Sequence, residues 1–183
     1  MNHIKKLKKM TACDSAIEFA EQYETIEEVI DACPKGEWLA WLAGEIGVDK
    51  RKQVLAAGRC ANTVIHLMHD QRSIDAVNGA IAYGNGEIGE EELIKLADAA
   101  AAAAAANADF WSARYAAAAA AAAARAANAD FWSARYAAAW AAAAADAASQ
   151  GADDRETNEL LTADICREVY RDELIKLFNN YEP

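Results

Sequence analysis

The amino-acid sequence predicts an all-α fold, a compact helical bundle or solenoid-like stack of about seven to nine helices with alanine-rich helices at its centre. Three observations support this class. Alanine, which has the highest intrinsic helix propensity, dominates the second half of the chain. Only two prolines and nine glycines interrupt the 183 residues. Outside the alanine tract, apolar residues recur at helical spacing.

The length of the chain favours a single domain. A chain of 183 residues that is 54% apolar can bury one hydrophobic core. We therefore expect one all-α domain over residues 1–183. Within it, N-terminal helices occupy 1–88, alanine-rich repeat helices occupy 89–148 and a C-terminal capping helix occupies 149–183.

The first predicted helical region extends from Thr11 to Ala32. Hydroxyl and carboxylate side chains at its start are suited to capping a helix, and the apolar residues that follow have helical spacing. It forms one helix, or two short helices with a break near Tyr23 to Thr25. Pro34 and Gly36 end this region. The next segment, EWLAWLAGEIG, predicts a short apolar helix whose tryptophans hold the N-terminal region onto the rest.

Two further helices are predicted before the alanine tract. Asp49 can cap a helix that extends to about Met68, and another helix covers about Ser73 to Tyr83. The glycine-rich turn GNGEIG after it connects two helices, because a phosphate-binding loop would need a preceding strand and a following Lys–Ser/Thr pair. His66 and His69 lie near the expected end of the first of these helices, where interaction with the helix dipole is favoured over a shared metal.

The alanine tract is interrupted twice by the same sequence, ANADFWSARYAAA, at 106–118 and again at 127–139. A single helix from Glu90 to Ala148 would extend roughly 90 Å at 1.5 Å per residue, which is too long for a compact domain of this size. In each copy an asparagine can end one helix in the left-handed conformation and an aspartate can cap the next. The tract therefore predicts three stacked helices, about Glu90–Ala106, Asp109–Ala127 and Asp130–Ala148.

The two interruptions also contain the candidate binding site. Trp111 and Tyr115 lie four residues apart and Arg114 lies three residues from Trp111, so one helical turn presents aromatic rings beside a guanidinium. Such a turn can stack a planar ligand and hold an anionic group. The candidate ligand-binding residues are Phe110, Trp111, Arg114, Tyr115, Phe131, Trp132, Arg135, Tyr136 and Trp140. Alternatively, the bulky residues form core between alanine helices and the arginines extend to solvent.

Beyond the alanine tract the composition changes. Ser149 to Gly151 predicts a turn, and a mixed-charge amphipathic helix follows it and packs back on the bundle as a cap. A coiled-coil partner surface is the alternative for this helix. Its apolar side is expected to contain Leu160, Leu161, Ile165, Val169, Leu174, Ile175, Leu177 and Phe178.

Charge and cysteine usage exclude several classes of function. A net charge of −11 disfavours a nucleic-acid polymer as partner, because such binding needs lysine and arginine to displace counterions. Charged residues within the alanine tract disfavour a membrane span, and the N-terminus lacks the pattern of a secretory signal. The four cysteines are scattered without metal-ligand spacing, which is typical of reduced, mostly buried thiols in a cytoplasmic protein. No catalytic, metal or cofactor motif is recognisable, so we expect no enzyme and no cofactor.

Two segments resemble known proteins. DQRSIDAVNGAIAYGNGEIGEEELIKLADAAAAAAAA, residues 70–105, resembles the alanine-rich immunity-protein family, in which an Asp-x-Arg start, a helix, a Gly-Glu turn and a long alanine tract follow one another. CPKGEWLAWLAGEIGVDKRKQVLAAGRCAN, residues 33–62, looks like the front half of related alanine-rich bacteriophage proteins. The resemblance implies a small helical protein of phage or bacterial conflict systems, and it implies no mechanism.

Taken together, these features predict a non-enzymatic conflict protein in the cytoplasm of the bacterial host. It neutralises a host defence by binding and sequestering a ligand, and a nucleotide-derived immune signal matches the aromatic–arginine turns best. Two alternatives stay open. One is an inhibitor or immunity protein that covers a defence effector or toxin with its acidic surface. The other is a structural alanine-rich module that assembles into a homo-oligomer.

Overall fold

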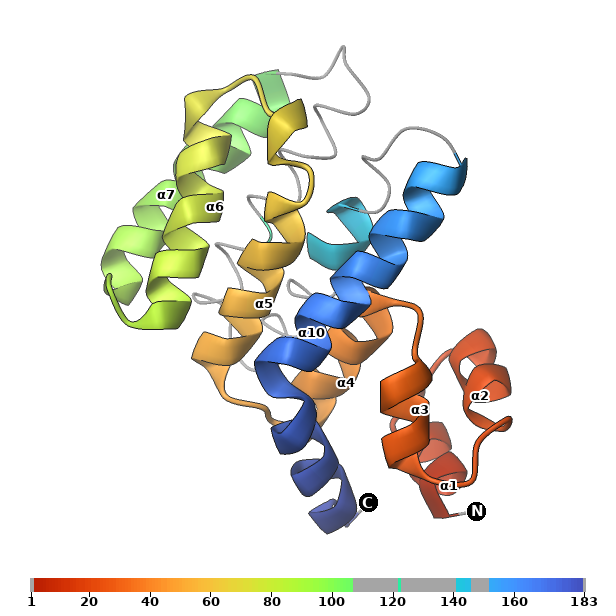
Figure 1. The fold of residues 1–183 in the computed structure, drawn as a ribbon. Helices are drawn as coiled ribbons and strands as arrows, with labels where there is room; N and C mark the ends of the chain where they lie inside the picture. Colours follow the sequence, from red (N-terminus) through yellow and green to blue (C-terminus); the bar gives the residue numbers. More distant parts are fainter. Residues whose placement is uncertain (1, 107–121, 123–140, 146–151, 183) are drawn as a thin grey trace.

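The computed structural model describes residues 2–106, 122, 141–145 and 152–182. These residues form eight α-helices and one 3₁₀ helix, and none of them lies in a β-strand. The all-α prediction of a bundle of about seven to nine helices is therefore confirmed (Figure 1). The elements are α1 (Asn2–Lys9), α2 (Asp14–Ala20), α3 (Ile26–Ala32), α4 (Gly36–Ile46), α5 (Lys50–Asn62), the 3₁₀ helix η1 (Ile65–Leu67), α6 (Gln71–Asn85), α7 (Glu90–Ala106) and α10 (Ala152–Asn180).

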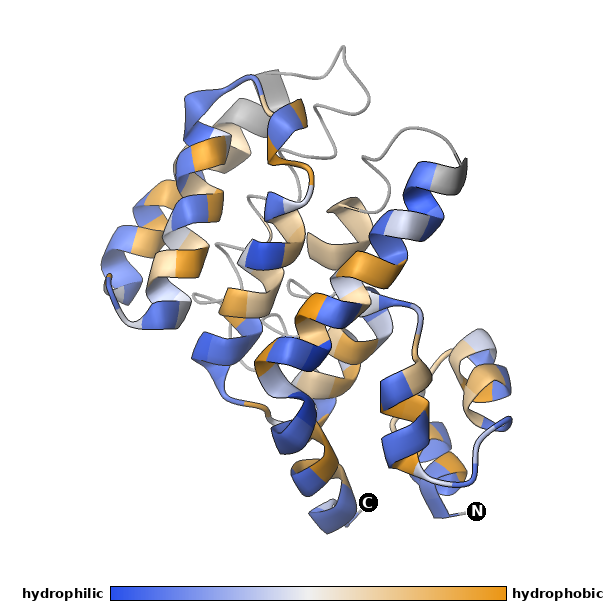
Figure 2. Cartoon of the chain, viewed as in Figure 1, coloured by the Kyte–Doolittle hydropathy of each residue, from blue (hydrophilic) through white to orange (hydrophobic). Residues whose placement is uncertain are grey.

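The helices pack around α10. In Figure 1, α10 crosses the middle of the molecule and contacts α4, α5 and α3. The packing then continues outward from α5 to α6 and from α6 to α7. The short helices α1, α2 and α3 form a group near the C-terminal end of α10. Figure 2 shows both hydrophilic and hydrophobic residues on each of the longer helices, the composition that packing one face against neighbours requires.

The described part of the alanine tract lies in the hydrophobic core. Ala100, Ala141 and Ala145 are fully buried, and residues 141–145 are helical. Alanine side chains contribute little area each, so close approach of the helices has to supply the contacts. Helix α7 has the predicted bounds of Glu90 and Ala106. Most of the other two predicted repeat helices, Asp109–Ala127 and Asp130–Ala148, lies outside the described residues.

Local capping signals explain where several helices begin or end. Of the two alternatives for Thr11 to Ala32, two short helices are observed, α2 and α3. The N-cap residue of α2, Cys13, makes no side-chain cap hydrogen bond, whereas at α3 the Thr25 side chain accepts a hydrogen bond from the Glu28 backbone N–H and the Glu28 carboxylate accepts one from that of Thr25. Asp49 caps α5 by accepting from two backbone N–H groups. Helices α4 and α6 both end at glycines with left-handed backbone, at φ 79° and 83° respectively.

The predicted extension of α5 to Met68 is wrong. The helix ends at Asn62, and the Thr63 hydroxyl donates a 2.8 Å hydrogen bond back to the carbonyl of Cys60. Three β-branched residues follow one another at 63–65, and such residues lose side-chain freedom in a helix. The backbone leaves the helical region at Val64, whose side chain is buried, and continues as η1. His66 therefore lies in η1 and His69 beyond it, rather than in the last turn of α5.

The predicted apolar side of α10 is partly wrong. Leu174 and Phe178 are buried, and Ile165, Val169, Ile175 and Leu177 are half-buried, but Leu160 and Leu161 are 47% and 46% exposed. The buried face of this part of the helix contains Asn158, Thr162, Ala163, Cys166 and Tyr170 instead. A kink at Tyr170, with φ −146° and ψ 16°, divides α10. Thr162 lies at the closest approach of α10 to α4, where Gly36 leaves no room for an added Cβ, so the face of Thr162 and not that of Leu160 and Leu161 packs inward.

Glycines mark the closest helix contacts. At Gly36 in α4, an added Cβ atom would lie 2.7 Å from the backbone carbonyl carbon of Thr162 in α10. At Gly84 in α6, an added Cβ would lie 2.9 Å from the Cα of Leu55 in α5. Both neighbours are backbone atoms, which a change of side-chain rotamer does not move. The two helix pairs thus depend on the absence of a side chain at these positions.

The sequence predicts no membrane-spanning helix. Of the helices that the structure describes, none combines the length and the hydropathy needed to cross a lipid bilayer.

Gly84→Ala tests this packing. Helix propensity alone predicts that alanine stabilises the helix by about 1 kcal/mol. We expect the opposite, a loss of about 1–3 kcal/mol in the free energy of unfolding, because the new methyl group forces α5 and α6 apart. Asn78→Ala, at an exposed position of the same helix, is the matched control and is expected to leave stability unchanged or slightly raised. Urea denaturation measures both, and a Gly84→Ala protein as stable as the wild type would contradict this account.

Candidate functional site

The sequence-predicted site is not among the described residues. All nine candidate aromatic and arginine residues, from Phe110 to Tyr115 and from Phe131 to Trp140, fall within 107–121 and 123–140, outside the part of the chain that the structure describes. Their proposed role in ligand binding stays a prediction. Its competing interpretation as core packing stays open for the same reason.

The described arginines do not offer a free anion-binding group. Arg51 donates to the carbonyl of Tyr83 and its guanidinium lies 4.5 Å from the centre of that tyrosine ring. Arg72 and Asp70 form a bidentate pair at the start of α6. The other described arginines donate to carboxylates or carbonyls of the chain: Arg59 to Glu168, Arg155 to Glu159, Arg167 to Ile30, Cys33 and Asp164, and Arg171 to Asp31 and Asp172. Each described arginine thus has a partner within the chain, whereas the arginines at 114, 125 and 135 lie outside the described residues.

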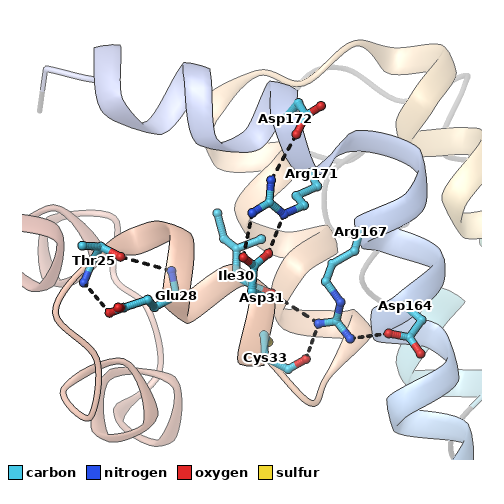
Figure 3. Close-up of polar contacts among 9 residues, drawn as sticks. All are labelled: Thr25, Glu28, Ile30, Asp31, Cys33, Asp164, Arg167, Arg171 and Asp172. Atoms are coloured by element: carbon cyan, nitrogen blue, oxygen red, sulfur yellow. Dashed lines mark hydrogen bonds and ion pairs between the residues drawn. The ribbon is translucent and has the colours of Figure 1, made fainter.

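Two arginines of α10 hold the end of α3, as Figure 3 shows. The guanidinium of Arg171 binds both carboxylate oxygens of Asp31, at 2.5 and 2.6 Å. Arg167 donates to the carbonyls of Ile30 and Cys33 at 3.2 and 2.6 Å. These carbonyls belong to the last turn of α3, where backbone acceptors have no partner within the helix. We call this set of contacts the α3–α10 clamp.

The clamp changes the acidity of its carboxylate. Hydrogen bonds from Arg171 lower the pKa of Asp31, and the same contact raises the pKa of Arg171. Both side chains are partly exposed, at 49% and 37%, so solvent screens the pair. The Asp31–Arg171 pair therefore contributes modestly to the free energy of unfolding. Because its geometry is bidentate, its contribution lies in the upper part of the range for exposed ion pairs.

A cleft of about 470 Å³ lies between the end of α5 with η1 and the first turns of α10. Residues on α10 at spacings of three and four, from Asp154 to Leu161, form one wall. The opposite wall comes from the irregular segment that ends α5 early. The lining residues are Thr63, Val64, His66, Leu67, Asp154, Thr157, Asn158 and Leu161. We call it the η1–α10 cleft.

The η1–α10 cleft combines an apolar and a polar side. Val64, Leu67 and Leu161 supply hydrocarbon surface, whereas the other five lining residues supply hydroxyl, amide, imidazole and carboxylate groups. Asn158 is only 8% exposed. The η1–α10 cleft was not predicted from the sequence. The spacing of Asp154, Thr157, Asn158 and Leu161 was visible on α10, but nothing in the sequence indicated that a 3₁₀ turn would face it.

The buried thiols fill core space. Cys33, Cys60 and Cys166 are buried and reduced, whereas Cys13 is exposed, which agrees with the prediction of mostly buried free thiols. Burial raises the pKa of the Cys33 thiol to about 11, so the nucleophilic thiolate is scarce at neutral pH. The buried Tyr170 hydroxyl lies near the Cys166 thiol, and burial raises its pKa well above the ordinary value. These groups pack the contact of α10 with α4 and α5.

The described histidine, cysteine and acidic side chains do not form a metal site. Within the part of the chain that the structure describes, no three or more histidine, cysteine, aspartate or glutamate residues are grouped so that they could hold an ion. His66 faces the η1–α10 cleft together with a single carboxylate, that of Asp154.

Comparison with known proteins returned no match: no family model, no curated protein and no solved structure is similar to this chain. Function therefore has to be argued from the residues themselves.

Asp31→Asn tests the α3–α10 clamp. Because the folded-state pKa of Asp31 is lowered, the pair stabilises fully above the unfolded carboxyl pKa of about 3.9 and is lost as pH falls through the lower folded value. We expect the variant to lose about 0.5–1 kcal/mol at pH 7. Asp31→Asn and wild type should converge in acid, which urea denaturation at several pH values measures.

Asp172→Asn is the matched control for this experiment. Asp172 contacts the same arginine, Arg171, at 3.2 Å, but its side chain is 96% exposed. We expect its removal to change stability little at any pH, because solvent already screens the pair. Equal losses in the two variants would show that the bidentate geometry of Asp31 has no special effect.

Proposed function

We propose that this protein is a non-enzymatic binding protein of phage or bacterial conflict that sequesters a nucleotide-derived immune signal. The observation that carries the proposal is the duplicated aromatic–arginine turn FWSARY, at 110–115 and 131–136. Aromatic rings stack a nucleobase, and a guanidinium binds a phosphate with two parallel hydrogen bonds. A duplicated turn supplies two such units, which suits a ligand with two bases or two phosphates.

Electrostatics supports assigning the phosphate to these turns. The chain carries a net charge of −11, so an anionic ligand is repelled except where cations gather. Every arginine among the described residues already donates to an acceptor of the chain, for example Arg167 to the end of α3 and Arg59 to Glu168. Arg114 and Arg135 are the arginines that stand within the aromatic turns.

Binding without turnover is the mode that fits the described side chains. Three of the four cysteine thiols, the most nucleophilic groups by type, are buried, at 33, 60 and 166, and the Cys33 thiol has a raised pKa, whereas Cys13 is exposed. A buried thiol of high pKa is a poor nucleophile. Sequestration requires only a site that fits its ligand, and the repeated turns meet that requirement without a reacting group.

Replacing Arg114 and Arg135 together by alanine tests the proposal. We expect calorimetric titration with a panel of cyclic dinucleotides and ADP-ribose-type nucleotides to give binding for wild type and none for the double variant. Each charge-assisted contact that is lost costs about 1.5–3 kcal/mol. Circular dichroism should show unchanged helicity, since alanine favours helix. Mass spectrometry of small molecules released from freshly purified protein identifies the ligand independently.

Arg125→Ala is the matched control for the double variant. Arg125 lies in the same alanine tract but outside both copies of FWSARY. It should therefore keep wild-type binding if the aromatic turns form the site. Absence of heat with every nucleotide, or an equal loss of affinity in Arg125→Ala, would overturn the proposal.

A further inference from the structure

We infer that the η1–α10 cleft and the adjoining outer face of α10 form a docking surface for a basic protein, with the cleft accepting one arginine side chain of that partner. This inference goes beyond the proposed function, because another part of the chain binds another class of partner. We call the whole surface the α10 docking face. It consists of the cleft together with Leu160, Asp164 and Glu168.

The charge of the cleft selects a cation. Asp154 is the carboxylate among the described residues that line it, and these residues include no lysine or arginine. The protein as a whole has a net charge of −11. A phosphate or carboxylate entering the cleft would meet like charge, whereas a guanidinium or ammonium would be attracted.

The shape and chemistry of the cleft suit arginine. Its aliphatic stem can pack against Val64, Leu67 and Leu161, as long cationic side chains do along apolar surfaces. Its planar guanidinium has five N–H donors, and the Asp154 carboxylate on the polar side of the lining can accept from them. Arginine anchored in a pocket is also among the residues that dominate the binding energy of protein interfaces.

The outer face of α10 extends the cleft along the helix. Leu160 and Leu161 are the large apolar side chains that stand exposed among the described residues, at 47% and 46%. Asp164 lies three and four residues beyond these leucines and Glu168 four residues further, and their side chains are 71% and 70% exposed. Exposed apolar side chains bordered by charges are typical of interaction sites. Asp164 and Glu168 are paired with Arg167 and Arg59, so attraction of a positively charged protein comes from the net charge of −11 of the chain.

Charge also identifies the occupant as a different protein rather than a second copy of this chain. Two copies docking through α10 would bring together molecules that each carry a net charge of −11 and that repel one another. A basic protein with an arginine beside apolar side chains complements the cleft, the leucines and the carboxylates at once.

Nuclear magnetic resonance titration of the full-length protein tests the cleft. The probes are N-acetyl-arginine amide and its neutral isostere N-acetyl-citrulline amide. We expect the arginine probe to shift backbone amide signals of residues 63–67 and 154–161, and the citrulline probe to bind about tenfold more weakly because the charge attraction is lost. Asp154→Asn should remove this preference. Glu156→Gln, at an exposed carboxylate outside the cleft lining, should keep it.

A second titration tests the outer face. The probe is an amphipathic helical peptide of leucine and arginine, followed by fluorescence anisotropy. Leu160→Ser with Leu161→Ser should weaken its binding about tenfold or more, because two apolar contacts are lost. Glu91→Gln with Glu92→Gln removes two exposed charges from α7, far along the chain from this face, and should change binding little.

Three results would overturn the α10 docking face. Equal binding of arginine and citrulline probes would show that the cleft does not select a cation. Shifts outside 63–67 and 154–161 would place arginine binding elsewhere. Equal losses of peptide binding in the α10 and α7 double variants would show unspecific attraction to an acidic protein. None of these results bears on nucleotide binding by Arg114 and Arg135, so the two proposals fail separately.

Discussion

The close crossing of α10 over α4 is the constraint on which the rest of the structure depends. Gly36 faces Thr162 at this crossing, with backbone near backbone and no room for a larger side chain. The contact determines the rotation of α10 about its axis, since Thr162, Cys166 and Tyr170 must point inward. In this orientation Leu160 and Leu161 stay exposed, and Asp154, Thr157, Asn158 and Leu161 line the η1–α10 cleft. The early end of α5 supplies the opposite wall of that cleft.

The basic side chains have largely structural roles. Arg167 and Arg171 bind the end of α3, and Lys6 of α1 donates to the carbonyls of Phe178 and Asn179 at the other end of the contact. Beyond the kink at Tyr170, the last ten residues of α10 contact α1 and α3 through Phe178 and Asn179, and Glu173 accepts a hydrogen bond from Lys52 of α5. These basic side chains hold helices together. The charge of the surface toward partners is therefore set by the excess of carboxylates.

The two proposed binding functions use opposite charge chemistry. Nucleotide sequestration depends on arginines set into a tract of alanine, where aromatic residues recur in two identical copies. The α10 docking face depends on exposed leucines beside carboxylates and on a cleft whose described lining residues include Asp154 and no lysine or arginine. A conflict protein with both would capture a small anionic signal and also engage a basic protein, and each activity could be removed without the other.

The sequence by itself determined the helical class and the ends of several elements. Helix ends can be predicted where a cap acts on neighbouring backbone groups, as do Thr25, Asp49 and the glycines after α4 and α6. The bounds of α7 were predicted in the same way. Only the tertiary structure decided that Leu160 and Leu161 stay exposed and that a cleft forms at η1. Spacing along a helix shows which residues share a face, but the partner helix selects the face that is buried. On α10 that selection was made by the narrow crossing at Gly36, more than a hundred residues away in the chain.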